Sequence, residues 1–175
     1  MNYPPKPMRG WPNTSLHEQL INDPDWIAEP KKNGHRTYIF PTKNPLFLSR
    51  RGSKLSLSEL GDLPKEVKAL IGLKVVDAEL VMHPVPFLWL FDLPQARGRL
   101  RERRSRLSDW CAKISERCPN LKMMPLLPKR TAYQDALLAG EEGVVWKKLS
   151  SLYVMQMSPE NEISDWIKFK KPDTW

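Results

Sequence analysis

The chain has 175 residues, a net charge of +8 at pH 7 and a pI near 9.6. A hydrophobic share of 41% and seven tryptophans exclude an intrinsically disordered chain. The length fits one domain, or one domain with a small subdomain. The basic balance is consistent with a polyanionic partner such as nucleic acid, with solubility alone as the alternative explanation.

The cysteines, histidines and hydropathy exclude further classes. Cys111 and Cys118 are seven residues apart in one predicted helix, about 10 Å along its axis, which is too far for a disulfide. We therefore expect reduced, buried thiols and a cytoplasmic setting. No apolar run approaches ~20 residues and no signal-peptide pattern occurs, so we expect no membrane association. The histidines His17, His35 and His83 show no metal-ligand spacing.

Turn residues and hydrophobic periodicity divide the chain into short strands and helices. Residues 1–14, rich in proline, should form an extended N-terminal segment, and residues 15–175 a single domain. Ser15 and Glu18 have the capping-box spacing, which predicts a short helix to about Asn22. The elements predicted after it are strands over 26–31, 35–41 and 45–50 in one antiparallel sheet, a helical or turn-like segment over 57–70, strands over 73–82 and 86–93, a helix over 101–118, a strand over 122–127, a helix over 131–139, and strands over 142–148 and 164–171.

The balance of these elements indicates the fold class. Strands outnumber helices, and the connections suit antiparallel sheets with helices outside them. The sequence therefore predicts an α+β fold.

The segment from Glu29 to Arg36 is the most informative in the chain. Its Asn-Gly pair favours a tight turn between two strands, because both residues tolerate positive φ. Such a turn would hold the amine of Lys31 and the guanidinium of Arg36 at the mouth of a sheet, as a site for a phosphate compound and a lysine nucleophile requires. Adjacent strand residues face opposite ways, so only one of Lys31 and Lys32 can face such a site. A solvated loop lysine is the alternative.

Charged residues at strand positions extend this pattern. Lys168 and Lys170 are two residues apart and so share one face of a strand; an anion such as a triphosphate would relieve their repulsion. The alternative is a strand edge guarded by lysines. Glu29, Glu79 and Glu142 offer carboxylates of the kind that hold Mg²⁺, with surface salt bridges as the alternative.

Arginines are concentrated at the start of the predicted helix over 101–118. They oppose the helix dipole there, which suggests an anionic partner such as a DNA backbone. A solvated helical face is the alternative. The arginines are Arg97, Arg99, Arg101, Arg103, Arg104 and Arg106.

Six segments follow one another in a recognisable order. They are Lys31-Lys32-Asn33-Gly34-His35-Arg36, Ser49-Arg50-Arg51-Gly52, Asp77-Ala78-Glu79-Leu80, Phe91-Asp92-Leu93, Glu142-Gly143-Val144-Val145-Trp146-Lys147 and Trp166-Ile167-Lys168-Phe169-Lys170. This series resembles the motifs of the covalent nucleotidyltransferases, which are the ATP-dependent DNA and RNA ligases and the mRNA capping enzymes. Glu-Pro-Lys before the first motif and the S-R-x-G segment look most like the DNA ligases. Ala78 stands where the family usually has glycine.

The resemblance implies an ATP-grasp-like nucleotidyltransferase (adenylation) domain of DNA ligases, with two antiparallel β-sheets flanked by helices and a nucleotide cleft between them. It implies ATP and Mg²⁺ as cofactors, and nicked DNA or another 5′-phosphorylated polynucleotide as the partner. A lysine would form lysyl-AMP, and AMP would then pass to a 5′-phosphate.

The resemblance also implies roles for single residues. Lys31 would be the nucleophile, and Lys168 and Lys170 would assist at the α-phosphate. Phe91 would stack on the purine, with a core phenylalanine as the alternative. The other expected contacts are Glu29 with adenine, Glu79 with a ribose hydroxyl, Arg36 and Arg50 with ribose or phosphate, Lys147 with a phosphate, and Glu142 with a metal ion or the lysine.

Two departures from the family pattern leave alternatives open. Only five residues follow Lys170, so we expect no OB-fold domain of the kind that follows in these ligases. The spacer before Lys168 lacks the usual Y-x-x-G-x-R-S. The alternatives are an RNA ligase, a capping-type GTP enzyme, or a non-catalytic nucleic-acid-binding module that keeps the fold.

Overall fold

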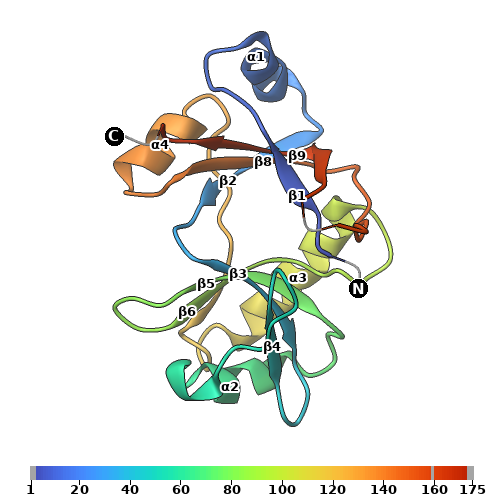
Figure 1. The fold of residues 1–175 in the computed structure, drawn as a ribbon, viewed down its shortest axis with the longest axis vertical. Helices are drawn as coiled ribbons and strands as arrows, with labels where there is room; N and C mark the ends of the chain where they lie inside the picture. Colours follow the sequence, from blue (N-terminus) through green and yellow to red (C-terminus); the bar gives the residue numbers. More distant parts are fainter. Residues whose placement is uncertain (1–2, 159, 173–175) are drawn as a thin grey trace. The chain divides into compact units, whose positions relative to one another are not determined.

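The computed structural model of the protein describes residues 3–158 and 160–172. The chain divides into two compact units, one made of residues 1–33 and 125–175 and the other of residues 34–124. Each unit is built around one β-sheet with helices against it (Figure 1). This confirms the predicted α+β fold.

The first unit contains a four-stranded sheet in the order β1-β9-β8-β2. Strands β2, β8 and β9 pair antiparallel, whereas β1 joins β9 in parallel. Helices α1 and α4 bury apolar side chains against the strands, in a core formed by Leu20, Ala28, Ala132, Val144, Trp146, Ile167 and Phe169. The elements are β1 (Lys6–Arg9), α1 (Ser15–Asn22), β2 (Trp26–Lys31), α4 (Ala132–Leu138), β8 (Gly143–Lys148) and β9 (Glu162–Lys170).

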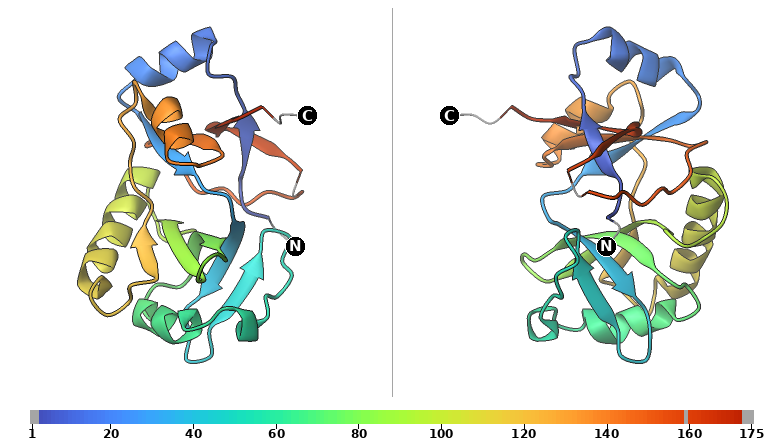
Figure 2. Two further views of the ribbon diagram at one scale, coloured as in Figure 1. Left: turned by 90° about the vertical axis from the view of Figure 1, so that its left-hand side faces the viewer. Right: turned by 45° about the vertical axis from the view of Figure 1, so that its right-hand side comes forward.

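The second unit contains a five-stranded sheet in the order β4-β3-β5-β6-β7. Its pairs are antiparallel except for β6 with β7. Helix α3 runs beside β6 and β7 (Figure 2), and α2 and α3 bury Leu63, Leu107 and Ile114 in the core beneath the sheet. The elements are β3 (His35–Phe40), β4 (Leu46–Ser49), η1 (Leu57–Glu59), α2 (Leu63–Glu66), η2 (Val67–Leu70), β5 (Val76–Val81), β6 (Phe87–Asp92), α3 (Leu100–Ile114) and β7 (Leu121–Met123).

The prediction that the first three strands after α1 form one sheet is wrong. β2 pairs with β8, whereas β3 pairs with β4 and β5. The Asn-Gly pair is not a hairpin turn, because no described non-glycine residue has a positive φ and Gly34 is not among the glycines that do. Gly34 is needed for another reason: a Cβ there would lie 2.4 Å from the carbonyl oxygen of Leu80.

The cap of one helix and the end of another differ from expectation. α1 spans Ser15–Asn22 as predicted, but its N-cap is Thr14, whose hydroxyl donates to the carbonyl of Trp11 at 2.8 Å instead of capping the helix. α3 ends at Ile114, so Cys118 lies beyond the helix. In the described part of the chain, no helix combines the length and apolar character needed to cross a membrane.

Candidate functional site

Three predicted site lysines share one face of the four-stranded sheet. Lys31 on β2 lies opposite Gly143 on β8, which lies opposite Lys170 on β9. Two residues along, Val145 lies opposite Lys168. Paired residues and residues two apart point to the same face, so the three lysines form one cluster. Their neighbours on the opposite face supply the core against α1 and α4.

Gly143 separates Lys31 from Lys170 without a side chain. Its φ of +145° lies in a region that favours glycine. A Cβ at this position would lie 2.0 Å from the carbonyl oxygen of Phe169, so no other residue fits. The glycine lets the backbones of β8 and β9 approach closely at this point.

The amine of Lys31 forms an ion pair with the carboxylate of Glu142. The backbone also holds Glu142 in place: its N–H donates to the carbonyl of Lys31 at 3.0 Å, and its own carbonyl accepts from Lys171 at 2.8 Å. The two side chains are 25% and 24% exposed, so solvent reaches the pair. Lys32 pairs with Glu141, and the two neighbouring lysines therefore contact different carboxylates.

Glu29 and Lys147 form a second ion pair on the same sheet face. Their charged atoms are 2.6 Å apart, and the side chains are only 2% and 3% exposed. The amine of Lys147 also lies 4.4 Å from the ring centroid of Trp166, a cation–π contact. An unpaired charge is costly to bury. Glu29 and Lys147, both predicted to contact the nucleotide, neutralise each other's charge in this pair.

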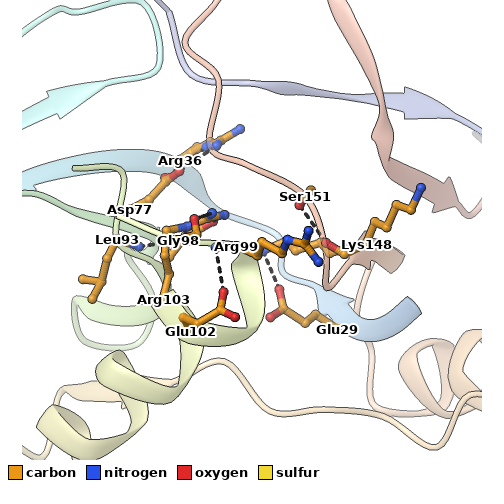
Figure 3. A network of polar contacts seen from close by, with 12 residues as sticks. Glu29, Arg36, Asp77, Leu93, Gly98, Arg99, Glu102, Arg103, Lys148 and Ser151 are labelled. Carbon is orange, nitrogen blue, oxygen red and sulfur yellow. Dashed lines mark hydrogen bonds and ion pairs between the residues drawn. The ribbon is translucent and has the colours of Figure 1, made fainter. Parts of the chain in front are cut away.

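The second unit brings Arg36, Glu79 and Phe91 together. Arg36 on β3 lies opposite Glu79 on β5, and its guanidinium carbon is 5.5 Å from the ring centroid of Phe91. Asp77, two residues before Glu79, accepts two hydrogen bonds from Arg36, at 3.0 Å from Nε and 2.6 Å from Nη2 (Figure 3). This fork-to-carboxylate contact fixes the guanidinium.

Arg50 lies in the turn after β4. The N–H of Gly52 donates to the carbonyl of Ser49 at 2.8 Å, and Gly52 has a φ of +84°, which explains the glycine of the S-R-x-G segment. Arg50 thus belongs to the same unit as Arg36, Glu79 and Phe91. The other predicted site residues, Lys31, Lys168, Lys170, Glu29, Glu142 and Lys147, belong to the first unit.

Asp92 and Arg103 form a buried ion pair that sequence reasoning missed. Both side chains are fully buried, and Asp92 accepts from Nε of Arg103 at 2.7 Å and from Nη2 at 3.0 Å. The expectation of a phosphate-binding surface is therefore wrong for Arg103. The helical spacing could have predicted this burial. Arg103 lies three residues after Leu100 and four before Leu107, both fully buried, and so falls on the same face of the helix.

The remaining arginines of α3 differ from one another. Nη2 of Arg104 donates to the carbonyl of Met124 at 2.5 Å, whereas Arg101 and Arg106 are exposed. Arg99, just before the helix, donates its backbone N–H to the carboxylate of Glu102 at 2.6 Å (Figure 3). The arginine run is thus partly structural.

The two cysteines lie in the core of the second unit. Cys111 and Cys118 are free and buried, which confirms that they form no disulfide. Burial raises the pKa of Cys111 to about 11 and also raises the pKa of Cys118, beside Glu66. Among the described residues, no group of three or more His, Cys, Asp or Glu side chains could hold a metal ion.

Comparison with known proteins shows the fold. No family model and no curated protein matches the sequence. Among solved structures, the chain is similar to Pmar-Lig_PreS3 (18% identity, TM-score 0.75, 97% of this chain and 46% of that one). It is also similar to the ligase domain of M. tuberculosis LigD (20%, 0.71, 97% and 60%). A third similar structure is the ATP-dependent DNA ligase of bacteriophage T7 in complex with ATP (15%, 0.69, 96% and 68%).

These likenesses confirm the predicted fold as that of the nucleotidyltransferase domain of ATP-dependent DNA ligases. The chain spans about half of the first of these structures, and 60% of the LigD ligase domain.

Proposed function

We propose that this chain is the adenylation domain of an ATP-dependent DNA ligase, with Lys31 as its nucleophile. The observation that carries the proposal is the cluster of Lys31, Lys168 and Lys170 on one sheet face. Lys31 pairs with Glu142, and the amine of Lys168 lies 3.6 Å from the carboxylate of Glu162. Both pairs are partly exposed, so the triphosphate of ATP can compete with the carboxylates for these amines.

The proposed step joins Lys31 to AMP. Neutral Nζ attacks the α-phosphorus of ATP, a P–N bond forms, and the P–O bond to pyrophosphate breaks. The attacking amine must first lose a proton, and the carboxylate of Glu142, already paired with it, is the group positioned to accept that proton. Lys168 and Lys170 stabilise the negative charge that develops on the α-phosphate.

The remaining predicted contacts bind the nucleotide. Phe91 stacks on the purine, and the guanidinium groups of Arg36 and Arg50 donate to ribose or phosphate. The contact with Asp77 holds Arg36 in place, so Nη1 is its proposed donor. Glu79 accepts from a ribose hydroxyl. Glu29 and Lys147 contact adenine and phosphate, and the binding of ATP exchanges part of their mutual ion pair for contacts with the ligand.

Mg²⁺ accompanies ATP in this proposal. The described residues offer no cluster of three metal-ligating side chains, and Mg²⁺ is commonly held by one or two carboxylates together with substrate phosphates. Glu142 is the carboxylate proposed here. The ion supplies charge neutralisation of the triphosphate.

The acceptor of AMP is the 5′-phosphate of a nicked DNA strand, from which a 3′-hydroxyl then displaces AMP. The Glu-Pro-Lys and S-R-x-G segments and the DNA-ligase fold support DNA over RNA. The net charge of +8 suits a polyanionic substrate.

The test is the intact mass of the 175-residue chain after incubation with ATP and Mg²⁺, and separately with GTP and Mg²⁺. We expect an AMP adduct with ATP and no GMP adduct with GTP. A GMP adduct would indicate a capping-type enzyme. Absence of any adduct would refute the enzyme and favour a binding module.

A further inference from the structure

Trp11 and Arg9 form an exposed pair that the adenylation step does not use. The guanidinium carbon of Arg9 lies 4.6 Å from the centroid of the Trp11 ring, a cation–π geometry. Trp11 is 52% exposed, and in the described part of the chain it is the only exposed residue among Phe, Trp and Tyr. An indole left open to solvent in this way is available to a flat ligand.

The backbone around Trp11 is fixed on both sides. The N–H of Gly10 donates to the carbonyl of Lys168 at 3.0 Å, and the hydroxyl of Thr14 donates to the carbonyl of Trp11 at 2.8 Å. A Cβ on Gly10 would lie 2.2 Å from Cε1 of Phe169, so glycine lets the chain pack closely on β9. The indole is therefore presented from an anchored segment.

The register places Arg9 beside the lysine cluster. Arg9 on β1 is the partner of Lys168 on β9, so the two side chains share the sheet face that carries Lys31 and Lys170. At the other end of β1, Lys6 is neutralised by Glu160 at 3.1 Å and Glu162 at 3.8 Å. Within the described residues no carboxylate pairs with Arg9, which leaves its charge available to an anion.

From these observations we propose that Arg9 and Trp11 bind an unpaired stretch of the polynucleotide substrate, with the indole stacked on a base and the guanidinium on a phosphate. The inference rests on the proposed function for the class of substrate. Aromatic stacking with a nearby cation is the usual way in which proteins hold single strands without sequence preference. Bases inside a continuous duplex stack on one another, so only an unpaired or frayed base can offer its face to Trp11.

Fluorescence anisotropy with a labelled single-stranded oligonucleotide of mixed sequence tests this site. Trp11→Ala should weaken binding by roughly five-fold or more, and Trp11→Phe should restore most of the affinity because the ring is kept. Leu138→Ala, at another exposed apolar residue on α4, is the matched control and should bind as the wild type does. Arg9→Gln should lower the slope of affinity against salt by about one, and Lys6→Gln by less.

Three results would overturn the inference. The first is wild-type affinity of Trp11→Ala for the single strand. The second is an equal loss of affinity for a blunt, continuous duplex, which would indicate contact without base stacking. The third is loss of the AMP adduct by Trp11→Ala when ATP and Mg²⁺ are present without oligonucleotide, which would assign the pair to the nucleotide. Failure of the wild-type chain to form an adduct bears on the proposed function instead, and is read in a separate experiment without oligonucleotide.

Discussion

Each unit contains an ion pair between a basic and an acidic side chain, and the two pairs differ in how far they are buried. Lys31–Glu142 is about a quarter exposed, whereas Arg103–Asp92 is fully buried and joined by two hydrogen bonds. A buried charge that loses its partner is strongly destabilising, while a partly exposed pair can be opened by a ligand at small cost. The first arrangement suits chemistry and the second suits structure.

The largest effect is expected from replacing Lys31, the proposed nucleophile, in the partly exposed pair. Lys31→Ala should abolish the AMP adduct while leaving the free energy of unfolding nearly unchanged, because the pair it breaks is partly exposed. Mass spectrometry and urea unfolding measure the two effects. Lys32→Ala is the matched control and should retain most of the adduct. Labelling that survives in Lys31→Ala and disappears in Lys32→Ala would reverse the assignment.

The buried pair should show the opposite behaviour. Arg103→Ala leaves Asp92 charged and buried, so we expect a loss of about 3–5 kcal/mol in the free energy of unfolding, measured by urea denaturation. Arg101→Ala, at an exposed position of the same helix, should change it by less than about 0.5 kcal/mol. Equal stability of the two variants would show that the Arg103 pair contributes nothing.

The role of the neighbouring lysines is expected to be smaller than that of the nucleophile. Lys168→Ala and Lys170→Ala should each slow single-turnover formation of the AMP adduct by roughly 100-fold, as the loss of one charge-stabilising donor does. Rapid-quench kinetics at saturating ATP measure the rate. Unchanged rates in both variants would make these lysines structural.

The smallest effect concerns the buried thiol of Cys111 in the second unit. Burial raises its pKa to about 11, so the thiol is protonated at neutral pH, and only the thiolate reacts. In a Cys118→Ser background, alkylation by iodoacetamide should be slow at pH 7.5 and rise with pH up to about 11. A rate at pH 7.5 equal to that of free cysteine would contradict this.

Positions along the chain were more predictable than pairings between strands. Turn residues and short apolar runs located β2, β3, β5, β6, β8 and β9, because these signals lie within each strand and at its ends. The same pattern says nothing about the partner, so β2 was assigned to the wrong sheet and the parallel pairing of β1 with β9 was not foreseen.

In the candidate site, too, local spacing was predictable from the sequence, whereas contacts between distant residues were not. The two-residue spacing of Lys168 and Lys170 already fixed their common face, and the register adds Lys31. The density of arginines in the sequence, in contrast, predicted the same surface role for Arg103 as for its exposed neighbours. Its acceptor, Asp92, lies eleven residues away on β6, and only the folded chain brings the two together.

The separation of β2 from β8 in the sequence has a consequence for the order of folding. The second unit is one continuous segment, residues 34–124, whereas the first unit needs both ends of the chain. During synthesis from the N-terminus, β2 therefore waits without its antiparallel partner until β8 emerges, while all five strands of the other sheet are already available to pair. Closing so long a loop slows folding, and a nascent chain would hold β2 without this partner until residues 143–148 are made.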